Sequence, residues 1–473
     1  MRTIKHIIDN TLDSKIVSEL SIDNNTLIND KLKSEMFRYV QPIDDTVTFG
    51  EWKQHIPQYD FEYIGGQMVS TRTMTDLSNS YSLFNTVAIF ASDFASQFML
   101  NTNVYWQKKI GGINDDNGFG ITIDSNNNIY LIGYHTTDTN NLIDMGVIKL
   151  NSEGNLLWQK KIGGAGNDYG QSITVDTFGN VYIIGNQTSD ALGIFDYGIV
   201  KLDTNGNMLW QKKIGGNGSD FGIGIAVDSE GNIYLNGYQT SDSFGIVDYG
   251  VIKLDTNGNL IWQKKIGGTG NNYGRSIAID TNNNIYLNGY QDSDSYGGYD
   301  YGVIKLDTNG NLIWQKKIGG TGIDYGRAIA VDGESNVYLN GYQNSDSYGG
   351  NDYGVIKLDS SGNMIWQKKI GNTGDDYGIA IAVDSNGNVY LNGQQQSDSY
   401  GLFDSGVIKL DTDGNIIWQK KLGGVGSDMG RGIAVDSNSN VYLIGFQDSD
   451  SYGGNDYGII KLGSTQSSDM TLS

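Results

Sequence analysis

The chain has 473 residues, a formal net charge of −22 at pH 7 and no cysteine. The absence of cysteine excludes thiol catalysis, thiolate metal sites and disulfides, and the negative charge disfavours binding to nucleic acid or to an anionic membrane. With 66 glycines and only 2 prolines, the composition favours short strands joined by glycine turns.

Residues 1–101 are expected to form a small segment of mixed structure. The chain starts MRTIKHIIDNTLDSK, without a continuous apolar stretch and cleavage site, so we expect no secretory signal peptide. Apolar residues between Ile4 and Leu20 recur near helical spacing and predict a short amphipathic helix or a broken helix pair. The apolar stretch at 82–100 is interrupted by Asp93, which predicts buried structure and no membrane span. We interpret this segment as an attachment module that holds the protein, through protein partners, in a phage virion or a bacterial surface appendage.

Most of the remaining chain repeats one unit of 52 residues. The motif WQKK recurs at this constant spacing without any insertion. A fixed period of this length is typical of solenoids and propellers. The repeated tryptophans are Trp106, Trp158, Trp210, Trp262, Trp314, Trp366 and Trp418.

One unit shows how the period divides into strands. Four segments, at 327–332, 337–343, 353–358 and 364–370, alternate apolar and polar residues and are bounded by Gly, Asn and Asp. Units of four strands are the blades of a propeller, whereas a helical solenoid would need an apolar rhythm of about 3.6 residues. The sequence therefore predicts an all-β fold, a seven-bladed β-propeller of four-stranded blades.

The two ends of the array predict how the ring closes. The array opens with a lone fourth strand at 104–110 and ends with a third strand at 457–462. Pairing these two strands in one blade leaves no open edge. We therefore assign residues 102–463 to the propeller and residues 464–473 to a polar tail.

The units resemble the bacterial β-propeller repeats called SBBP repeats. The resemblance lies in the DSxGNVYLxGY pattern, which stands here as DSNGNVYLNG at 384–393 and DTNNNIYLNGY at 280–290. It implies a bacterial or phage-associated propeller, often on exported or surface proteins, with no common catalytic activity. It therefore supports the fold more than a function.

Loop length distinguishes the two faces of the predicted propeller. One face carries long loops, such as 319–326 and 343–352, and the other carries only short hairpin turns. Because loops on a rigid scaffold usually carry binding, the long-loop face is the candidate binding face. Three rings of acidic residues repeat on it. The first ring is Asp116, Asp168, Asp220, Asp324, Asp376 and Asp428 with Asn272 in the fourth place; the second is Asp138, Asp190, Asp242, Asp294, Asp346, Asp398 and Asp450; the third is Asp144, Asp196, Asp248, Asp300, Asp352, Asp404 and Asp456.

The acidic rings have two interpretations. Asp and Ser side chains can cap turns and accept hydrogen bonds from neighbouring backbone amides, which explains their recurrence without a ligand. Alternatively, oxygen ligands in glycine-rich loops could bind calcium, although the spacing and the terminal glutamate of an EF-hand are absent. The calcium candidates are Asp292, Asp294, Asp300, Asp448, Asp450 and Asp456. No other cofactor is expected.

Aromatic residues next to these carboxylates suggest a ligand site. Stacking on an aromatic ring beside hydrogen-bonding carboxylates is a way to bind sugar, and repetition would add avidity. The alternative is that each tyrosine packs on its own loop or on the adjacent blade. The candidate ligand-binding residues are Tyr296, Tyr348, Tyr400, Tyr452, Asp294, Asp300, Asp346, Asp352, Asp450 and Asp456.

Catalysis is disfavoured by the symmetry of the array. The three histidines are His6, His55 and His135, so the repeats cannot build a multi-histidine metal centre or a Ser-His-Asp arrangement. A propeller enzyme normally departs from symmetry at one central site, and the array is expected not to do so beyond small changes such as Asn272 and His135. We expect a non-enzymatic structural or recognition protein that binds a cell-surface glycan or protein. The alternatives are a polysaccharide hydrolase or lyase acting through paired carboxylates, and a free secreted lectin-like protein.

Overall fold

The computed structural model describes two units, each of them treated by itself. The units are Val104–Thr465 and the combination of Met1–Asn103 with Gln466–Ser473. In the second of these, the structure describes an antiparallel hairpin of β1 (Phe61–Ile64) and β2 (Gln67–Ser70). The predicted helix near the N-terminus lies outside the described residues. The described ranges are 61–64, 67–70, 102–111, 114–136, 142–188, 195–240, 246–292, 297–344, 350–396, 402–424, 426–447 and 455–466.

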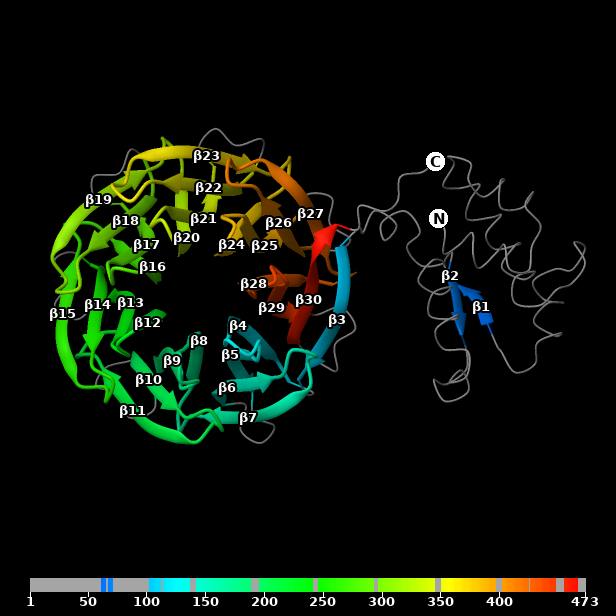
Figure 1. Ribbon diagram of the computed structural model, residues 1–473, viewed down its shortest axis with the longest axis horizontal. Coiled ribbons are helices and arrows are strands. Elements are labelled where there is room, and N and C mark those ends of the chain that lie inside the picture. The colour runs from blue at the N-terminus through cyan, green and yellow to red at the C-terminus, as the bar shows by residue number, and fades with distance from the viewer. Residues whose placement is uncertain are drawn as a thin grey trace, which may run out of the picture. The chain divides into compact units, whose positions relative to one another are not determined.

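Seven four-stranded antiparallel sheets stand around a central axis, which confirms the predicted seven-bladed propeller (Figure 1). The innermost strands are β4 (Asp116–Ile123), β8 (Asp168–Val175), β12 (Asp220–Val227), β16 (Asn272–Ile279), β20 (Asp324–Val331), β24 (Asp376–Val383) and β28 (Asp428–Val435). The second strands are β5 (Ile129–Thr136), β9 (Val181–Gln187), β13 (Ile233–Gln239), β17 (Ile285–Gln291), β21 (Val337–Gln343), β25 (Val389–Gln395) and β29 (Val441–Gln447). The third strands are β6 (Ile143–Leu150), β10 (Asp196–Leu202), β14 (Asp248–Leu254), β18 (Asp300–Leu306), β22 (Asp352–Leu358), β26 (Asp404–Leu410) and β30 (Asp456–Gln466). The outermost strands are β3 (Thr102–Ile110), β7 (Leu156–Ile162), β11 (Met208–Ile214), β15 (Leu260–Ile266), β19 (Leu312–Ile318), β23 (Met364–Ile370) and β27 (Ile416–Leu422).

The core lies between adjacent blades. The second and third strands are buried along nearly their whole length, because both of their faces are covered by neighbouring blades. In one cluster, Tyr286 and Val303 of one blade pack against Ile329, Leu339 and Ile356 of the next. Blades of this kind cannot bury their apolar faces alone, so the stability of each depends on its neighbours.

The ring closes through a blade made from both ends of the array. Its strand order is β28-β29-β30-β3, so the N-terminal strand β3 completes the last blade, as predicted. The hydroxyl of Tyr457 in β30, a buried side chain, donates a hydrogen bond to the carbonyl of Gly146 in the first blade at 3.2 Å. The same bond joins consecutive blades, as between Tyr301 and Gly354 at 2.9 Å. The seam is therefore built like an ordinary interface between blades.

Five of the seven repeated tryptophans donate a hydrogen bond to a hairpin turn of the next blade. The indole Nε1 of Trp314 donates to the carbonyl of Ser360 in the following hairpin turn at 3.1 Å. The ammonium group of Lys305 donates to the same carbonyl at 3.0 Å and lies 4.8 Å from the ring centroid of Tyr286. One exposed turn of the next blade thus receives two donors from the blade before it.

Aspartates hold the short hairpin turns between inner and second strands. The carboxylate of Asp280 accepts bonds from the backbone of Asn282 (2.9 Å), from the backbone and side-chain amides of Asn284 (both 2.8 Å), and from the buried hydroxyl of Tyr286 (3.0 Å). Burial alone would raise the pKa of Asp280, but hydrogen bonds from Asn284 and Tyr286 lower it below the ordinary value. The recurring D-x-x-x-N-x-Y pattern is therefore a structural turn motif.

Candidate functional site

The first and third acidic rings are largely buried, which differs from the expected exposed acidic face. Asp300, Asp352 and Asp456 have 0% exposure. The carboxylate of Asp300 lies against the backbone at Gly319, where an added Cβ would stand 2.0 Å from its Oδ1 atom. In the first ring, Asp220 is also fully buried and accepts backbone N–H bonds from Gly216 (2.9 Å) and Thr240 (3.1 Å). The carboxylates of Asp220 and Asp300 therefore contact the loop backbone from inside the protein.

The other predicted ligand residues fall mostly outside the described residues. This holds for Tyr296, Tyr348, Tyr400, Tyr452, Asp294, Asp346, Asp448 and Asp450. Asp292 is described, and its carboxylate accepts bonds from the backbone (2.5 Å) and side-chain (3.0 Å) amides of Asn271, as a loop-linking residue would. Within the described ranges, no group of three or more His, Cys, Asp or Glu side chains is placed to hold a metal ion. Calcium and sugar binding by these loops stay predictions.

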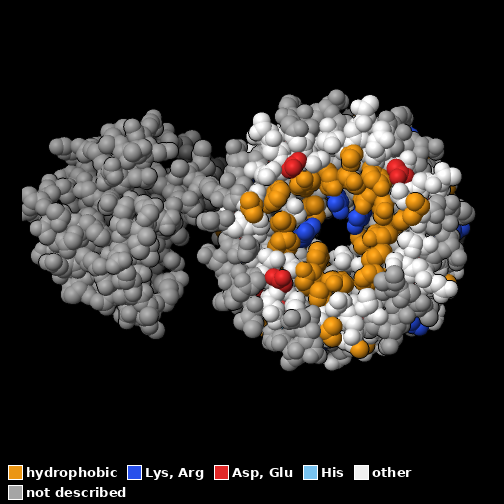
Figure 2. Space-filling model, turned by 180° about the vertical axis from the view of Figure 1, so that it is seen from behind, with side chains coloured by type: hydrophobic (Ala, Val, Ile, Leu, Met, Phe, Trp, Pro, Cys, Tyr) orange, Lys and Arg blue, Asp and Glu red, His pale blue; other side chains and the backbone are white. Residues whose placement is uncertain are grey.

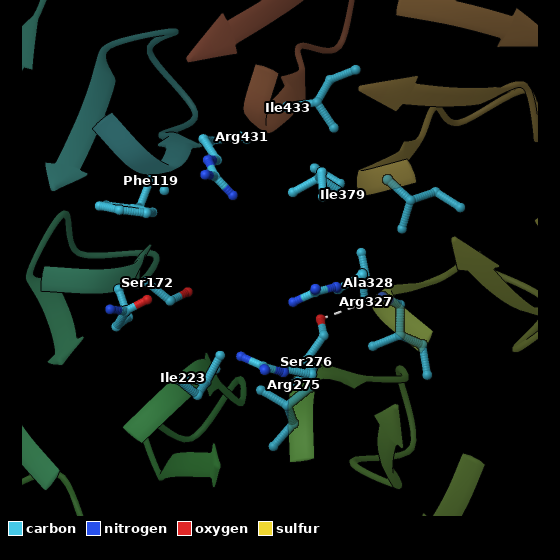
Figure 3. Close-up of a pocket in the computed structure, with 18 of the residues that line it drawn as sticks. Phe119, Ser172, Ile223, Arg275, Ser276, Arg327, Ala328, Ile379, Arg431 and Ile433 are labelled. Atoms are coloured by element: carbon cyan, nitrogen blue, oxygen red, sulfur yellow. Dashed lines mark hydrogen bonds between the residues drawn. The ribbon is translucent and has the colours of Figure 1, made fainter. Parts of the chain in front are cut away.

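A channel of about 450 Å³ runs between the innermost strands (Figure 3). One side chain from the same repeat position of every blade lines it, directly after the Gly of the D-Y-G motif. This position carries different residues in different blades, and none of the residues that line the channel is acidic. The side chains at this position are Phe119, Gln171, Ile223, Arg275, Arg327, Ile379 and Arg431.

The three arginines reach into the channel from β16, β20 and β28 (Figure 3). The guanidinium group of Arg275 donates a hydrogen bond to the hydroxyl of Tyr290 at 2.6 Å, and that of Arg327 donates to Tyr342 at 3.1 Å. Arg431 lies 5.3 Å from the ring centroid of Phe446, which has no hydroxyl to accept a bond. Among the described residues, no carboxylate pairs with these guanidinium groups.

Aromatic side chains form a continuous arc beside the arginines. Most are half-buried and come from the start of the inner strands and the end of the second strands. Consecutive ring centroids lie between 4.4 and 6.2 Å apart. Figure 2 shows hydrophobic side chains in a ring around the mouth of the channel, with basic side chains inside it. We call the following residues the aromatic collar: Phe195, Phe221, Tyr238, Tyr273, Tyr290, Tyr299, Tyr325, Tyr342, Tyr377 and Phe403.

Comparison with known proteins identifies the repeat. Residues 106–142, 157–190, 209–245 and 417–445 match the family model described as the SBBP β-propeller repeat. Four segments of the propeller therefore match the SBBP repeat.

Curated relatives of this propeller are longer than the chain. The "Uncharacterized WD repeat-containing protein L264" of Acanthamoeba polyphaga mimivirus is 24% identical over 456 residues, which cover 72% of this chain and 31% of that protein. The "Regulatory protein FlaEY" of Caulobacter vibrioides is 29% identical over 136 residues, which cover 26% of this chain and 14% of that protein. The chain therefore spans less than a third of the length of these relatives.

A solved structure agrees with the propeller fold. The crystal structure of the WD40 β-propeller domain of Doa1 superposes with a TM-score of 0.50 and 11% identity, covering 77% of this chain and 97% of that domain. At this identity the likeness concerns the fold alone. Among the described residues, no helix is long and apolar enough to cross a membrane.

A second departure from symmetry lies where the SBBP propeller closes. His135 stands where other blades carry Gln, and its Nδ1 atom lies 2.5 Å from Oδ1 of the buried Asp116. Both residues line a cavity of about 350 Å³ together with Lys160, Lys161 and Tyr457. The sequence had marked His135 as a small change, and the structure places its side chain, 24% exposed, at the seam between the closing blade and the first blade.

The expectation that the array keeps its symmetry apart from small changes such as Asn272 and His135 was wrong at the channel position. The channel position changes from blade to blade, with Ile223 and Ile379 in two blades, Gln171 in another and arginine in three. A simple signal was present in the sequence. Residues 102–463 contain three arginines, and all three occupy this position, namely Arg275, Arg327 and Arg431.

Proposed function

We propose that this SBBP propeller is a non-enzymatic interaction scaffold that binds a protein partner over the aromatic collar. The observation that carries the proposal is the collar itself, a continuous arc of half-buried rings at one mouth of the channel. Tyr and Phe supply large contact areas at little cost in side-chain entropy, and they are enriched at the centres of protein interfaces.

An aromatic residue at the collar position of the inner strand is not required for a blade to fold. At the position of Tyr273 and Tyr377, blade one has Asn117, and blade seven has Met429. The backbone of the inner strand is nevertheless formed in all seven blades. If packing alone demanded a ring at this position, one would be expected there in every blade, so its presence there in only five neighbouring blades favours a binding role.

The test uses variants with this natural precedent. The full chain carrying Tyr273→Asn and Tyr377→Asn is immobilised beside the unchanged chain, and proteins bound from a lysate of the source organism are quantified by mass spectrometry. These substitutions leave the ring contacts of the three arginines in place. The proposal expects at least a tenfold loss of specifically bound partner, since central aromatic residues each contribute about 2 kcal/mol or more.

A matched control removes an aromatic ring from another site. Phe178 is 81% exposed in a hairpin turn, and Phe178→Ser should leave partner binding unchanged. Partner binding that survives both collar substitutions, or that falls equally in the Phe178 variant, would refute the proposal. Circular dichroism melting curves of all variants show whether each is folded.

Other expectations accompany this proposal. The long-loop tyrosines and the second acidic ring would extend the contact area around the collar, and on that long-loop face they would also bind a surface glycan. Residues 1–101 would attach the scaffold to a larger assembly such as a virion or surface appendage. The channel lining holds no acidic residue, so we propose no catalysis by paired carboxylates in the channel.

A further inference from the structure

The channel concentrates positive charge in a strongly acidic protein. The net charge of the chain is −22, yet three arginines point into one space of about 450 Å³ that has no acidic lining residue. Like charges held this close repel one another, and their burial removes hydration. Such an arrangement is unfavourable unless something compensates it.

Each guanidinium group retains unused hydrogen-bonding capacity. The Nε atoms of Arg275, Arg327 and Arg431 are buried and have no hydrogen-bond partner among the described residues. A guanidinium group has five N–H donors. The structure gives one side-chain hydrogen bond each to Arg275 and Arg327, and none to Arg431. Donors therefore remain for a ligand.

The aromatic neighbours hold the arginines in place without neutralising them. Arg275 lies 5.7 Å from the ring centroid of Tyr238 and 5.2 Å from that of Tyr290. Arg431 lies between Phe119 at 5.6 Å and Phe446 at 5.3 Å. Ring faces attract the cation and restrict its motion, which lowers the entropy cost of binding an anion. Burial and the charge of Arg327 lower the pKa of Arg431 to about 10, so the group is still charged at pH 7.

We propose that the central channel is a binding site for a multivalent oxyanion, held by Arg275, Arg327 and Arg431. Planar guanidinium forks match the oxygen atoms of phosphate and carboxylate groups, and a low-dielectric enclosure strengthens each charge-assisted bond. The site lies below the collar, on a different set of residues, so it stands whether or not the collar binds a protein.

Isothermal titration calorimetry of the full chain tests the site with two probes. Inorganic pyrophosphate represents phosphate groups, and citrate represents carboxylates. Binding of one probe but not the other identifies the source of the oxyanion, and binding of either supports the site. Each Arg→Gln substitution should weaken the association constant about tenfold or more, because a hydrogen bond to a charged group contributes about 1.5 kcal/mol or more.

The chain provides its own matched variants. Gln171 occupies the same channel position in blade two, so R275Q, R327Q and R431Q place a residue that this fold already accepts. Removing the same number of charges from the outer strands, by K212Q, K264Q and K316Q, should leave the affinity within about twofold, because screened charges more than a Debye length away matter little. The Tyr273→Asn variant should also retain binding, which separates this site from the collar.

A second readout does not depend on the heat of binding that calorimetry measures. Pyrophosphate that binds only the folded state should raise the melting temperature of the unchanged chain and not that of the triple arginine variant. Three results would overturn the proposal. The first is no binding of either probe up to about 10 mM, which corresponds to a binding free energy weaker than about 3 kcal/mol. The second is an unchanged affinity in the triple arginine variant, and the third is an equal loss of affinity in the triple lysine variant.

Discussion

Replacing Asp280 with alanine should destabilise the propeller more than replacing Asp307, although both aspartates cap hairpin turns in the same region. Asp307 accepts bonds from the backbone of Asn309 (2.9 Å) and from the backbone (2.8 Å) and side chain (2.9 Å) of Asn311. Asp280 has the equivalent three bonds and one more, from the fully buried hydroxyl of Tyr286 at 3.0 Å.

The loss of unfolding free energy in each variant depends on which hydrogen-bond donors lose their acceptor. In Asp307→Ala the freed amides are exposed and can bind water, so the loss should be about 1 kcal/mol, similar to loss of a capping residue. In Asp280→Ala the hydroxyl of Tyr286 is also left without its acceptor inside the core, which adds about 2 kcal/mol. We expect about 3 kcal/mol for Asp280→Ala in urea unfolding at pH 7, followed by tryptophan fluorescence.

A double-mutant cycle isolates the buried hydroxyl. In a Tyr286→Phe background, the cost of Asp280→Ala should fall to about 1 kcal/mol, the value for Asp307→Ala, because no hydroxyl remains to be stranded. Equal costs for the two aspartates in the unchanged chain, or a cost for Asp280→Ala that does not fall in the Tyr286→Phe background, would refute the reasoning.

Three further predictions concern stability. Arg431→Gln should raise the unfolding free energy by about 1 kcal/mol. The folded protein lowers the pKa of Arg431 to about 10, so at neutral pH the charged side chain is less favourable in the folded protein than in the unfolded chain. A lower melting temperature for the variant would contradict this prediction. Gly319→Ala should lower the melting temperature, since its Cβ would meet the buried carboxylate of Asp300 at 2.0 Å, whereas Gly333→Ala, with no atom within 4 Å of its Cβ, should be neutral or stabilising by up to about 1 kcal/mol. Acid titration should leave the unfolding free energy constant down to about pH 4 and lower it below that pH, because hydrogen bonds lower the pKa of capping aspartates such as Asp307. These bonds stabilise the fold at pH values above the pKa of the unfolded chain and are lost as the carboxylates take up protons. A decline that begins near pH 6 would contradict this prediction.

The sequence predicts the strands well because each one is bounded by turn chemistry. The expected segments at 337–343 and 364–370 coincide with β21 (Val337–Gln343) and β23 (Met364–Ile370). The innermost strand was expected to begin at residue 327 and begins at Asp324. Its first residues, D-Y-G, were expected to form a loop because glycine and aspartate favour turns. In the structure they pair with the second strand, and a register shift between Gly326 and Ala328 lets the strand continue beyond them.

The candidate site was less predictable, for a physical reason. Repetition of a residue in every blade shows that it has a common role, but not whether it faces solvent or the interior. Asp300 and Asp352 repeat like surface ligands and yet are buried against backbone. The channel residues give the opposite signal, because Arg275 and Ile379 vary at one position that only the radial arrangement brings together. Variation within a regular repeat was therefore the more informative feature.

Hydrogen exchange of the full chain, alone and with its captured partner, tests the central claim most directly. The collar account predicts that partner binding slows amide exchange around Tyr273, Tyr299 and Tyr325, where inner strands begin and long loops end. The hairpin turn at 280–284 should exchange at an unchanged rate, because it lies at the opposite end of β16 (Asn272–Ile279). Protection of that turn without protection around the collar would contradict the account.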